Sequence, residues 1–482
     1  IGVSAGDALT SGKENVFVGN FAGTNLSTTT RTVCVGFEAG MNIANAIGNT
    51  AVGWRALKQY DLEAENTAIG SEAMSGAGAS NYCVALGTGA LSGATTSDAN
   101  FTVAIGYIAG RNITSGQRNL AIGGYALESL TVGDDNIAIG YRAAYNLGTS
   151  TFANRNIAIG TYALLSAANN NINDNIAIGY GALSQSVHSD GDNNVAIGTN
   201  ALSDLTAGAE GMVAIGTSAL RRTDHADAVG SVAIGMQALT SNVSGNGNVA
   251  IGYQALTTNI DGDRNTAVGY GALASHEADT DGHGENTSVG YQAGGDVSSG
   301  TGNTLIGSRA GNQGTDDITT GDNNTLIGKE ARASGAGGNN QNVIGASAVG
   351  QADNSVTLGN GDVTDVYMAQ DAGAKVRCSA IVHTQENVTI SSGAITVTSS
   401  YVRVLTEGSA SSDDLDTING GVAGQVLYLH QQLSTKDVTL KDDTGNLRLA
   451  GDFAMSHALD MIHLIYSEAD SVWIEVSRSN NN

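Results

Sequence analysis

The sequence contains no proline in 482 residues, although about 5% is usual in proteins. Proline cannot donate a hydrogen bond to a β-ladder and is therefore rare in interior strands. Its absence indicates a chain that uses most of its backbone in ladders. Aromatic residues make up only 5%, whereas glycine occurs 66 times. This composition favours narrow layers filled by small aliphatic side chains.

Positive charge and cysteine are also scarce. The chain has 21 Lys and Arg against 46 Asp and Glu, a net charge of −25. Such a surface repels phosphate backbones and anionic lipids, so we expect no nucleic-acid partner. No apolar run approaches the roughly 20 residues of a membrane-spanning helix, and we expect no membrane insertion. Three cysteines are too few for a disulfide framework, and we interpret Cys34 and Cys83 as small buried hydrophobic residues.

The sequence does contain an internal repeat. The stretch "NVAIGYQALTTNIDGDRNTAVGYGALAS" at 248–275 states nearly the same motif twice, 17 positions apart. We call the glycine that follows each short apolar run the marker glycine. A recurring period of this size is typical of a repeat architecture. The marker glycines are 14 to 21 residues apart and stand at positions 2, 19, 36, 53, 70, 87, 106, 123, 140, 160, 179, 198, 216, 235, 252, 269, 290, 307, 328, 345 and 359.

Each repeat has the pattern of one coil of a solenoid. In "NTAIG" at 66–70 larger residues alternate with small ones, which is the period of a β-strand. A second short strand is expected at Ala73 and Met74 and their equivalents. The segments between copies, such as "IDGDRN", contain turn signals. Residues 1–359 are therefore predicted to form a parallel β-solenoid (β-roll) of about 20 coils.

Two further features concern how coils and copies of the chain pack. Asn recurs four residues before the marker, as at Asn66 and Asn136, which predicts a ladder of side-chain amides from coil to coil. So short a coil has few apolar positions, and we expect a stripe of Ala, Gly and Leu along one side. Monomers rarely expose a stripe of this length, so we expect copies of the chain to cover it.

The period fails after Gly359. Residues 360–385 are interpreted as a neck or transition. Residues 386–482 contain alternating segments such as "AITVTSSYVRVLTE" and "DMIHLIY", which predict a C-terminal β-sandwich domain. Trp473 is interpreted as the core anchor of this domain.

These motifs carry a resemblance to known proteins. The "NTAIGxxAL" repeats resemble the head repeats of trimeric autotransporter adhesins and the repeat shafts of phage tail fibres, although the coils here are longer and less uniform than those of the adhesins. The segment from "DDLDTINGGVAGQVLYLHQQ" to "WIEVSRSN" is similar to a terminal domain of phage virion proteins. The resemblance implies a homotrimeric fibre on the virion surface or otherwise extracellular, which binds a host cell-surface glycan or protein. It also implies contact with other virion proteins through an N-terminal segment outside this chain. A bacterial surface trimeric adhesin is an alternative.

Signals for chemistry are weak. "GYGALA" at 269–274 matches part of a dinucleotide fingerprint, but that motif requires a following helix. No histidine pair has metal-ligand spacing. Acidic turns around Asp192, Asp263 and Asp322 could offer oxygens to Ca²⁺, but none has the full spacing of a calcium loop. We expect these carboxylates to be solvated turn residues, and we expect no cofactor.

We also expect no enzymatic activity. A glycosidase needs two carboxylates in a cleft, and such clefts are usually lined by aromatic residues, whereas this solenoid has few Phe or Trp. A polysaccharide-depolymerising tailspike is the alternative interpretation.

Recognition is expected where the repeat is least regular, because loops on rigid scaffolds commonly bind partners. The two longest intervals, of 21 residues, end at Gly290 and Gly328. The C-terminal domain competes for the same role. The candidate receptor-contact residues in the long turns are His276, Asp279, Asp281, His283, Asp316, Asp317 and Asp322.

Overall fold

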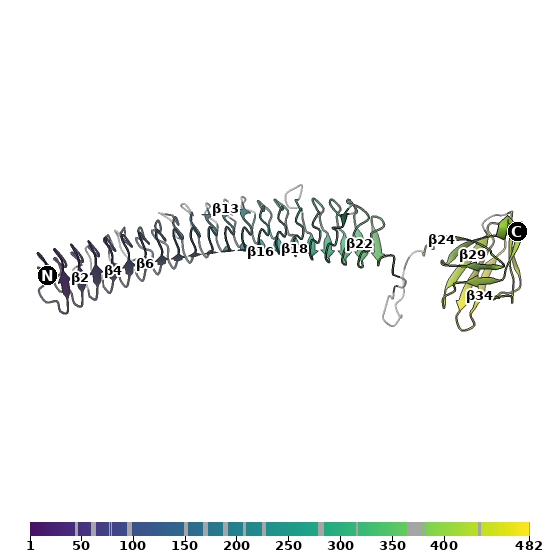
Figure 1. The fold of residues 1–482 in the computed structure, drawn as a ribbon, viewed down its shortest axis with the longest axis horizontal. Coiled ribbons are helices and arrows are strands. Elements are labelled where there is room, and N and C mark those ends of the chain that lie inside the picture. Colours follow the sequence, from purple (N-terminus) through teal and green to yellow (C-terminus); the bar gives the residue numbers. More distant parts are fainter. Residues whose placement is uncertain are drawn as a thin grey trace. The chain divides into compact units, whose positions relative to one another are not determined.

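A computed structural model gives the fold of the chain in two compact units, Ile1–Val366 and Tyr367–Asn482, each described by itself (Figure 1). The structure describes residues 1–482 apart from 44–46, 59–63, 77, 79, 94–98, 149–152, 167–171, 187–190, 206–208, 224–227, 278–283, 315–316, 364–365, 367–377, 379–380, 432–434 and 482.

The first unit is a β-solenoid, as predicted, with one strand of its main sheet per coil (Figure 1). Its twenty strands pair in parallel, and the register places equivalent repeat positions over one another, for example Ala68 on Ala85. The strands are β1 (Val16–Val18), β2 (Val33–Val35), β3 (Thr50–Val52), β4 (Thr67–Ile69), β5 (Val84–Leu86), β6 (Val103–Ile105), β7 (Leu120–Ile122), β8 (Ile137–Ile139), β9 (Ile157–Ile159), β10 (Ile176–Ile178), β12 (Val195–Ile197), β14 (Val213–Ile215), β16 (Val232–Ile234), β17 (Val249–Ile251), β18 (Thr266–Val268), β19 (Thr287–Val289), β20 (Thr304–Ile306), β21 (Thr325–Ile327), β22 (Gln341–Ile344) and β23 (Ser355–Leu358).

The marker glycines end these strands at a sharp corner. Gly123 has φ +131°, and a Cβ built on it would lie 2.4 Å from the carbonyl oxygen of Gly140 in the next coil. An L-residue is strained at this dihedral angle and has no space there. The repeated glycine is therefore fixed by close stacking of coil on coil.

The expected second strand at Ala73 and Met74 is wrong. These residues lie in a turn in which Glu72 and Met74 have φ of +57° and +52°. The turn still bonds to its neighbours, because the Met74 N–H donates to the Ala90 carbonyl at 2.9 Å. Coil-to-coil hydrogen bonds therefore persist here without extended dihedral angles. Three successive coils also form a second, small parallel sheet at a later position of the coil. Its strands are β11 (Gln185–Ser186), β13 (Asp204–Leu205) and β15 (Arg222–Thr223).

The expected exposed stripe of Ala, Gly and Leu is also wrong. The middle residue of every three-residue strand of the main sheet after β1, usually Ala, is buried, as at Ala68 and Ala138, and so are Ala126 and Leu127 after the marker Gly123. The flanking strand residues, such as Ile137 and Ile139, are partly exposed. In most strands the small side chain lies inside the narrow coil and the larger Val and Ile side chains point outward. In β20 and β21 a buried Leu takes the inner position.

The expected asparagine ladder is present. Most of its members are buried, and their side chains bond to neighbouring coils. The Asn136 N–H donates to Asn119 Oδ1 at 2.9 Å, and Asn136 Nδ2 donates to the Ala153 carbonyl at 2.8 Å. Buried backbone groups at this turn are thereby satisfied.

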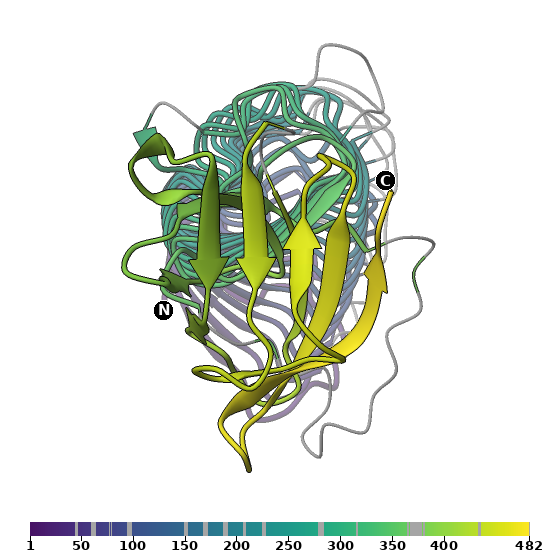
Figure 2. The same ribbon diagram turned by 90° about the vertical axis from the view of Figure 1, so that its right-hand side faces the viewer.

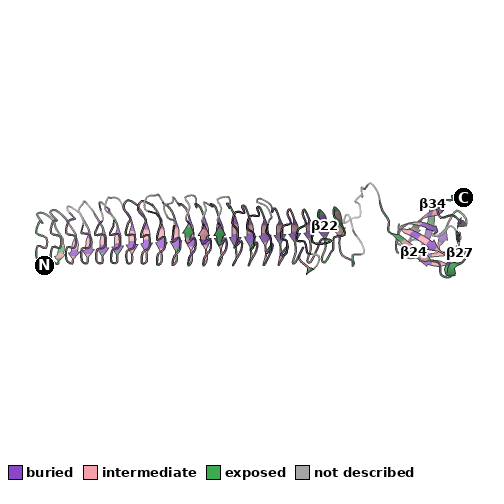
Figure 3. Cartoon of the chain, turned by 90° about the horizontal axis from the view of Figure 1, so that it is seen from above, coloured by how far each residue is buried: buried purple, intermediate pink, exposed green. Residues whose placement is uncertain are grey.

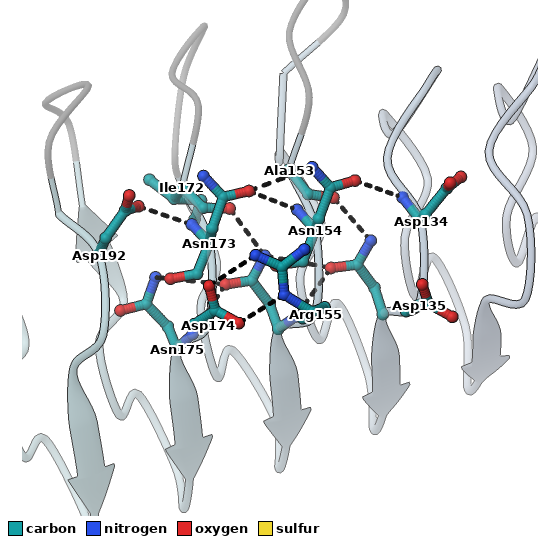
Figure 4. Close-up of polar contacts among 12 residues, drawn as sticks. Asp134, Asp135, Ala153, Asn154, Arg155, Ile172, Asn173, Asp174, Asn175 and Asp192 are labelled. Carbon is teal, nitrogen blue, oxygen red and sulfur yellow. Dashed lines mark hydrogen bonds and ion pairs between the residues drawn. The ribbon is translucent and has the colours of Figure 1, made fainter.

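A second ladder runs beside it, six residues before the marker (Figure 4). There the Asp134 N–H donates to Asn154 Oδ1 at 2.8 Å, and the Asn154 N–H donates to Asn173 Oδ1 at 3.1 Å. The Asn173 N–H in turn donates to Asp192 Oδ1 at 2.7 Å. In the first ladder each side-chain oxygen accepts from a backbone N–H of the following coil. In the second ladder it accepts from a backbone N–H of the preceding coil. The two ladders therefore run in opposite directions.

The second unit is all-β, as expected, and its sheets are mixed. Its first strands pair in parallel, β24 with β26, β26 with β29, β25 with β28 and β27 with β30. Its last long strands are antiparallel, β29 with β33 and β33 with β34 (Figure 2). Its elements are β24 (Gln385–Thr389), β25 (Ala394–Thr396), β26 (Tyr401–Leu405), the 3-10 helix η2 (Glu407–Ser409), β27 (Ser412–Leu415), β28 (Thr417–Asn419), β29 (Val426–Gln431), β30 (Asp437–Leu440), β31 (Leu447–Arg448), β32 (Phe453–Met455), β33 (Met461–Ser467) and β34 (Val472–Ser479).

The interpretations of Trp473 and of the two solenoid cysteines are confirmed. Trp473 is fully buried, and its Nε1 donates to the Ile418 carbonyl at 3.0 Å. Cys34 and Cys83 are buried, and neither forms a disulfide bond. Burial raises the pKa of the Cys34 thiol to about 12, so this side chain behaves as an apolar core residue.

Candidate functional site

The main sheet of the solenoid carries a continuous apolar outer surface, which we call the aliphatic face. It consists of the outward-facing residues of the main-sheet strands, which in most strands flank a buried middle residue and are mostly Val, Ile and Thr. Leu86 is 44% exposed and Ile306 39%, and Figure 3 shows partly exposed residues along the row of strands. Twenty strands at about 4.8 Å spacing give a face about 90 Å long. Monomeric proteins rarely expose an apolar surface of this extent.

Tyrosines form two columns just beyond the marker glycines. In the first, Tyr107, Tyr125 and Tyr141 meet edge to face at 5.3 and 6.0 Å between ring centroids. The Arg142 guanidinium lies 5.5 Å from the Tyr125 ring and 5.2 Å from the Tyr145 ring. Aromatic and cation–π contacts of this kind stiffen the surface on which they lie.

In the second column the rings stack face to face. Tyr253 lies 5.0 Å from Tyr270, and Tyr270 lies 5.3 Å from Tyr291, both at 22° between planes. Arg309 continues the column, with its guanidinium 5.8 Å from the Tyr291 ring. The sequence analysis did not predict either column, because it considered only Phe and Trp among the aromatic residues and left out Tyr. The available signal was Tyr directly after the marker in "GYQAL", "GYGAL" and "GYQAG".

From Arg118 to Asp174, the charge five residues before the marker alternates from one coil to the next. Arg155 Nε donates to Asp174 Oδ1 at 2.6 Å (Figure 4), and Arg118 pairs with Asp135 at 2.6 Å. Hydrogen bonding by Arg155 lowers the pKa of the Asp174 carboxyl below its ordinary value. Because equivalent residues stack in register, this alternation keeps like charges apart.

The acidic turns considered for Ca²⁺ belong to the second ladder. Asp263 is only 5% exposed; its Oδ1 accepts from the Asn246 N–H and its Oδ2 from Asn246 Nδ2, both at 2.9 Å. Asp322 Oδ1 accepts from the Thr301 N–H at 2.7 Å. The expectation of a solvated carboxylate is therefore wrong for Asp263, which bridges two coils. Within the described ranges no three His, Cys, Asp or Glu side chains are grouped to hold a metal ion.

The candidate receptor-contact residues separate into three groups. Asp279, Asp281, His283 and Asp316 lie outside the described residues. Asp322 is partly exposed and is a ladder residue, as described above. His276 and Asp317 are both buried, at 0% and 8% exposure. A projecting position is therefore wrong for these last two.

His276 is buried because it occupies an interior position of the repeat. It is the seventh residue after the marker Gly269, and the equivalent residues Asn259 and Val297 in the adjacent coils are also fully buried. Burial lowers the pKa of the imidazole to about 4, and a smaller effect of the Ser298 backbone acts in the opposite direction. The histidine is thus a neutral core residue at pH 7.

The long turn before Asn324 contains a four-residue insertion. The segment "DITTGDNN" at 317–324 is equivalent to "DVSSGTGN" at 296–303, because the Ser298 N–H donates to the Thr319 carbonyl at 2.8 Å. Ile318 is therefore the equivalent of buried Val297 and is itself fully buried. The extra residues are 313–316. The Asp317 carboxylate accepts from the Gln313 N–H and so holds the start of the insertion.

The described part of this insertion walls an open polar hollow of about 340 Å³, at the lower end of ligand-pocket sizes. We call this site the polar hollow. It lies between two adjacent coils at the end of the second tyrosine column, since Arg309 contacts the Tyr291 ring. Its lining residues are Gln292, Asp296, Arg309, Asn312, Gln313 and Gly314.

Comparison with known proteins assigns no family to this arrangement. No protein-family model matches the chain, and no curated protein matches it. Across the described residues, no helix has the length and apolar character needed to cross a membrane.

Proposed function

We propose that this chain is a structural fibre protein of a virion, which assembles as a homotrimer and attaches to a host cell through a surface glycan or protein. The observation that carries the proposal is the aliphatic face. A rigid solenoid with a long apolar side and acidic turns is suited to assemble with copies of itself and to present its remaining surface outward.

The energetics favour a self-complementary partner. Val and Ile side chains gain about 1.5 to 3 kcal/mol when fully buried, and the aliphatic face carries them on most of its strands. A second copy of the chain has the same length, the same coil spacing and the same aliphatic residues. Three parallel copies around an axis would bury all three faces together. The number three is taken from the resemblance to trimeric adhesin heads and fibre shafts.

Assembly is tested by placing charge on the aliphatic face. Ile159→Lys combined with Ile306→Lys should convert a trimer to single chains in light scattering after size exclusion, because three buried lysines per level cannot be paired. Both residues are already more than a third exposed in the single chain, so each coil should still fold.

The matched control carries the same charge on exposed turns. Ser11→Lys combined with Thr320→Lys should remain trimeric, since both residues are exposed and lie outside the main sheet. A wild-type chain that runs as a single copy would overturn the assembly proposal.

Attachment and location are tested separately. Labelled wild-type protein should bind intact host cells, and gold-labelled antibodies should decorate virions. Decoration of the bacterial surface in the absence of phage would favour a cell-borne adhesin. Sustained release of reducing ends from host polysaccharide would favour a depolymerising tailspike.

A further inference from the structure

We infer that the polar hollow binds a neutral hexopyranose unit of a surface glycan. The inference rests on the proposed attachment function, because it names the receptor chemistry and its site. It is carried by the convergence of four polar side chains beside an exposed tyrosine, at the point where the repeat has an insertion.

The hydrogen-bonding groups of the hollow fit a ligand rich in hydroxyls. Arg309 offers donors, Asp296 offers acceptors, and the amides of Gln292 and Gln313 offer both. These four side chains make no hydrogen bond or ion pair with other residues that the structure describes. Sugar hydroxyls both donate and accept, so one pyranose ring can engage all three kinds of group.

Tyr291 lies next to the hollow and holds the lining residue Arg309 in place. Its side chain is 45% exposed, and its ring is fixed by stacking on Tyr270 at 5.3 Å. The Arg309 guanidinium packs at 5.8 Å from the same ring. Both groups are therefore held by the column before any ligand arrives, which lowers the entropic cost of binding.

The charges of the hollow favour a neutral sugar over an acidic one. Arg309 and Asp296 carry opposite charges and both line the hollow. The chain as a whole carries −25, and this field repels polyanions. A carboxylate ligand would be attracted by Arg309 but repelled by Asp296.

The insertion explains why the hollow forms in this coil. Gln313 and Gly314 are inserted between Asn312 and Asp317, whereas the equivalent residues Gly295 and Asp296 of the preceding coil are consecutive. Asp317 and the buried Ile318 anchor the far end of the insertion to the solenoid. A recognition loop on a rigid scaffold is the common arrangement of binding sites.

The test uses the full chain and ligand-observed NMR with methyl glucoside, methyl galactoside, methyl N-acetylglucosaminide and methyl glucuronide as probes. We expect at least one neutral glycoside to bind with a Kd of about 1 mM, a free energy near −4 kcal/mol. Arg309→Ala and Gln292→Ala should each weaken it about tenfold or more. Gln237→Ala is the matched control, because Gln237 holds the position of Gln292 in a coil whose following coil has no insertion, and it should leave binding unchanged.

A deletion variant keeps the test independent of side-chain truncation. Removing residues 313–316 brings Ile318 to the seventh position after the marker Gly307, so the coil should fold with an unchanged melting temperature and lose sugar binding. Absence of binding by every neutral probe, unchanged binding in the deletion variant, or tighter binding of the glucuronide would each overturn the inference.

Cell binding separates this inference from the proposed function. If wild type and Arg309→Ala attach to host cells equally well, the hollow is not the receptor site, while attachment itself stands. If wild type binds neutral glycosides at the hollow but attaches to no cells, the sugar site stands and the attachment function falls.

Discussion

The positions of the repeat differ in which side chains they tolerate. The marker glycine is required by its backbone, because both its dihedral angle and its distance to the next coil exclude a side chain. The ladder asparagine is required by its amide, since Asn136 both accepts and donates between coils. The middle strand residue is usually alanine, but Cys34, Ser288 and Leu305 also fill this buried position. Tolerance at each position therefore follows from the neighbouring coil.

Gly123→Ala should destabilise the solenoid strongly. The added Cβ would lie 2.4 Å from the Gly140 carbonyl oxygen at φ +131°, and strain of this kind costs about 3 kcal/mol. Because repeat proteins can open locally, the loss should be largest in hydrogen-exchange protection of the coils around Gly123. Gly335→Ala is the control, since no heavy atom lies within 4 Å of its added Cβ. Equal protection in the two variants would contradict the close-stacking argument.

His276 should make solenoid stability depend on pH. Its folded pKa of about 4 lies below its ordinary value of 6.5, so the unfolded chain binds the proton more readily. The contribution is fully present above pH 6.5 and is lost as the pH falls through about 4, a change of about 3 kcal/mol.

The measurement is the melting temperature between pH 7 and pH 4 for wild type, His276→Leu and His276→Asn. Leu147 and Asn259 fill the same repeat position in other coils, so both variants should fold. Both should lose less stability than wild type on acidification, and carboxylate contributions should cancel in the comparison. Parallel curves for all three proteins would show that His276 does not titrate as a buried group.

At the scale of the coil, the period and the turn signals predicted the solenoid, its parallel stacking and its asparagine ladder. They did not predict which face lies inside. Alternation as in Thr67, Ala68 and Ile69 defines two faces, but the width of the coil decides that alanine is buried. The prediction of a strand at Ala73 and Met74 was wrong for a related reason. Non-glycine residues there have left-handed dihedral angles, and a two-residue alternation in the sequence does not predict them.

The candidate site was predictable only in part. The long interval before Gly328 correctly marked an irregular coil, and aligning 296–303 with 317–324 would have located the insertion. That alignment would also have placed Asp317 and Ile318 in the regular frame. The polar hollow itself depends on side chains from two coils, Gln292 and Arg309 among them, and no local pattern brings these together.

The alternating charges make a prediction for the coil. Arg155→Glu would place three acidic residues in register, because Asp135 and Asp174 occupy the same position in the adjacent coils. The melting temperature should fall at low salt and recover at high salt, because exposed charges are screened. Arg155→Gln should show a smaller fall, since it removes the pair without adding repulsion. A salt-independent fall in Arg155→Glu would indicate a steric effect instead.

At the scale of the whole molecule, two opposing terms act on the proposed assembly. The aliphatic face favours association of copies, whereas the net charge of −25 on each chain opposes it. Charge repulsion acts over a Debye length of about 10 Å at 0.1 M salt and is reduced as salt increases. Apolar burial is not weakened by this screening.

The assembly should therefore become more stable as salt rises. In sedimentation velocity at low micromolar protein, the fraction of trimer should increase between about 0.01 M and 1 M NaCl, over which the Debye length falls from about 30 Å to about 3 Å. The Ile159→Lys and Ile306→Lys variant should stay a single chain throughout, because salt cannot restore its aliphatic face. An assembly held mainly by ion pairs between chains would respond in the opposite direction, since screening weakens such pairs. Dissociation of the wild type with added salt would thus contradict the aliphatic face as the contact between copies.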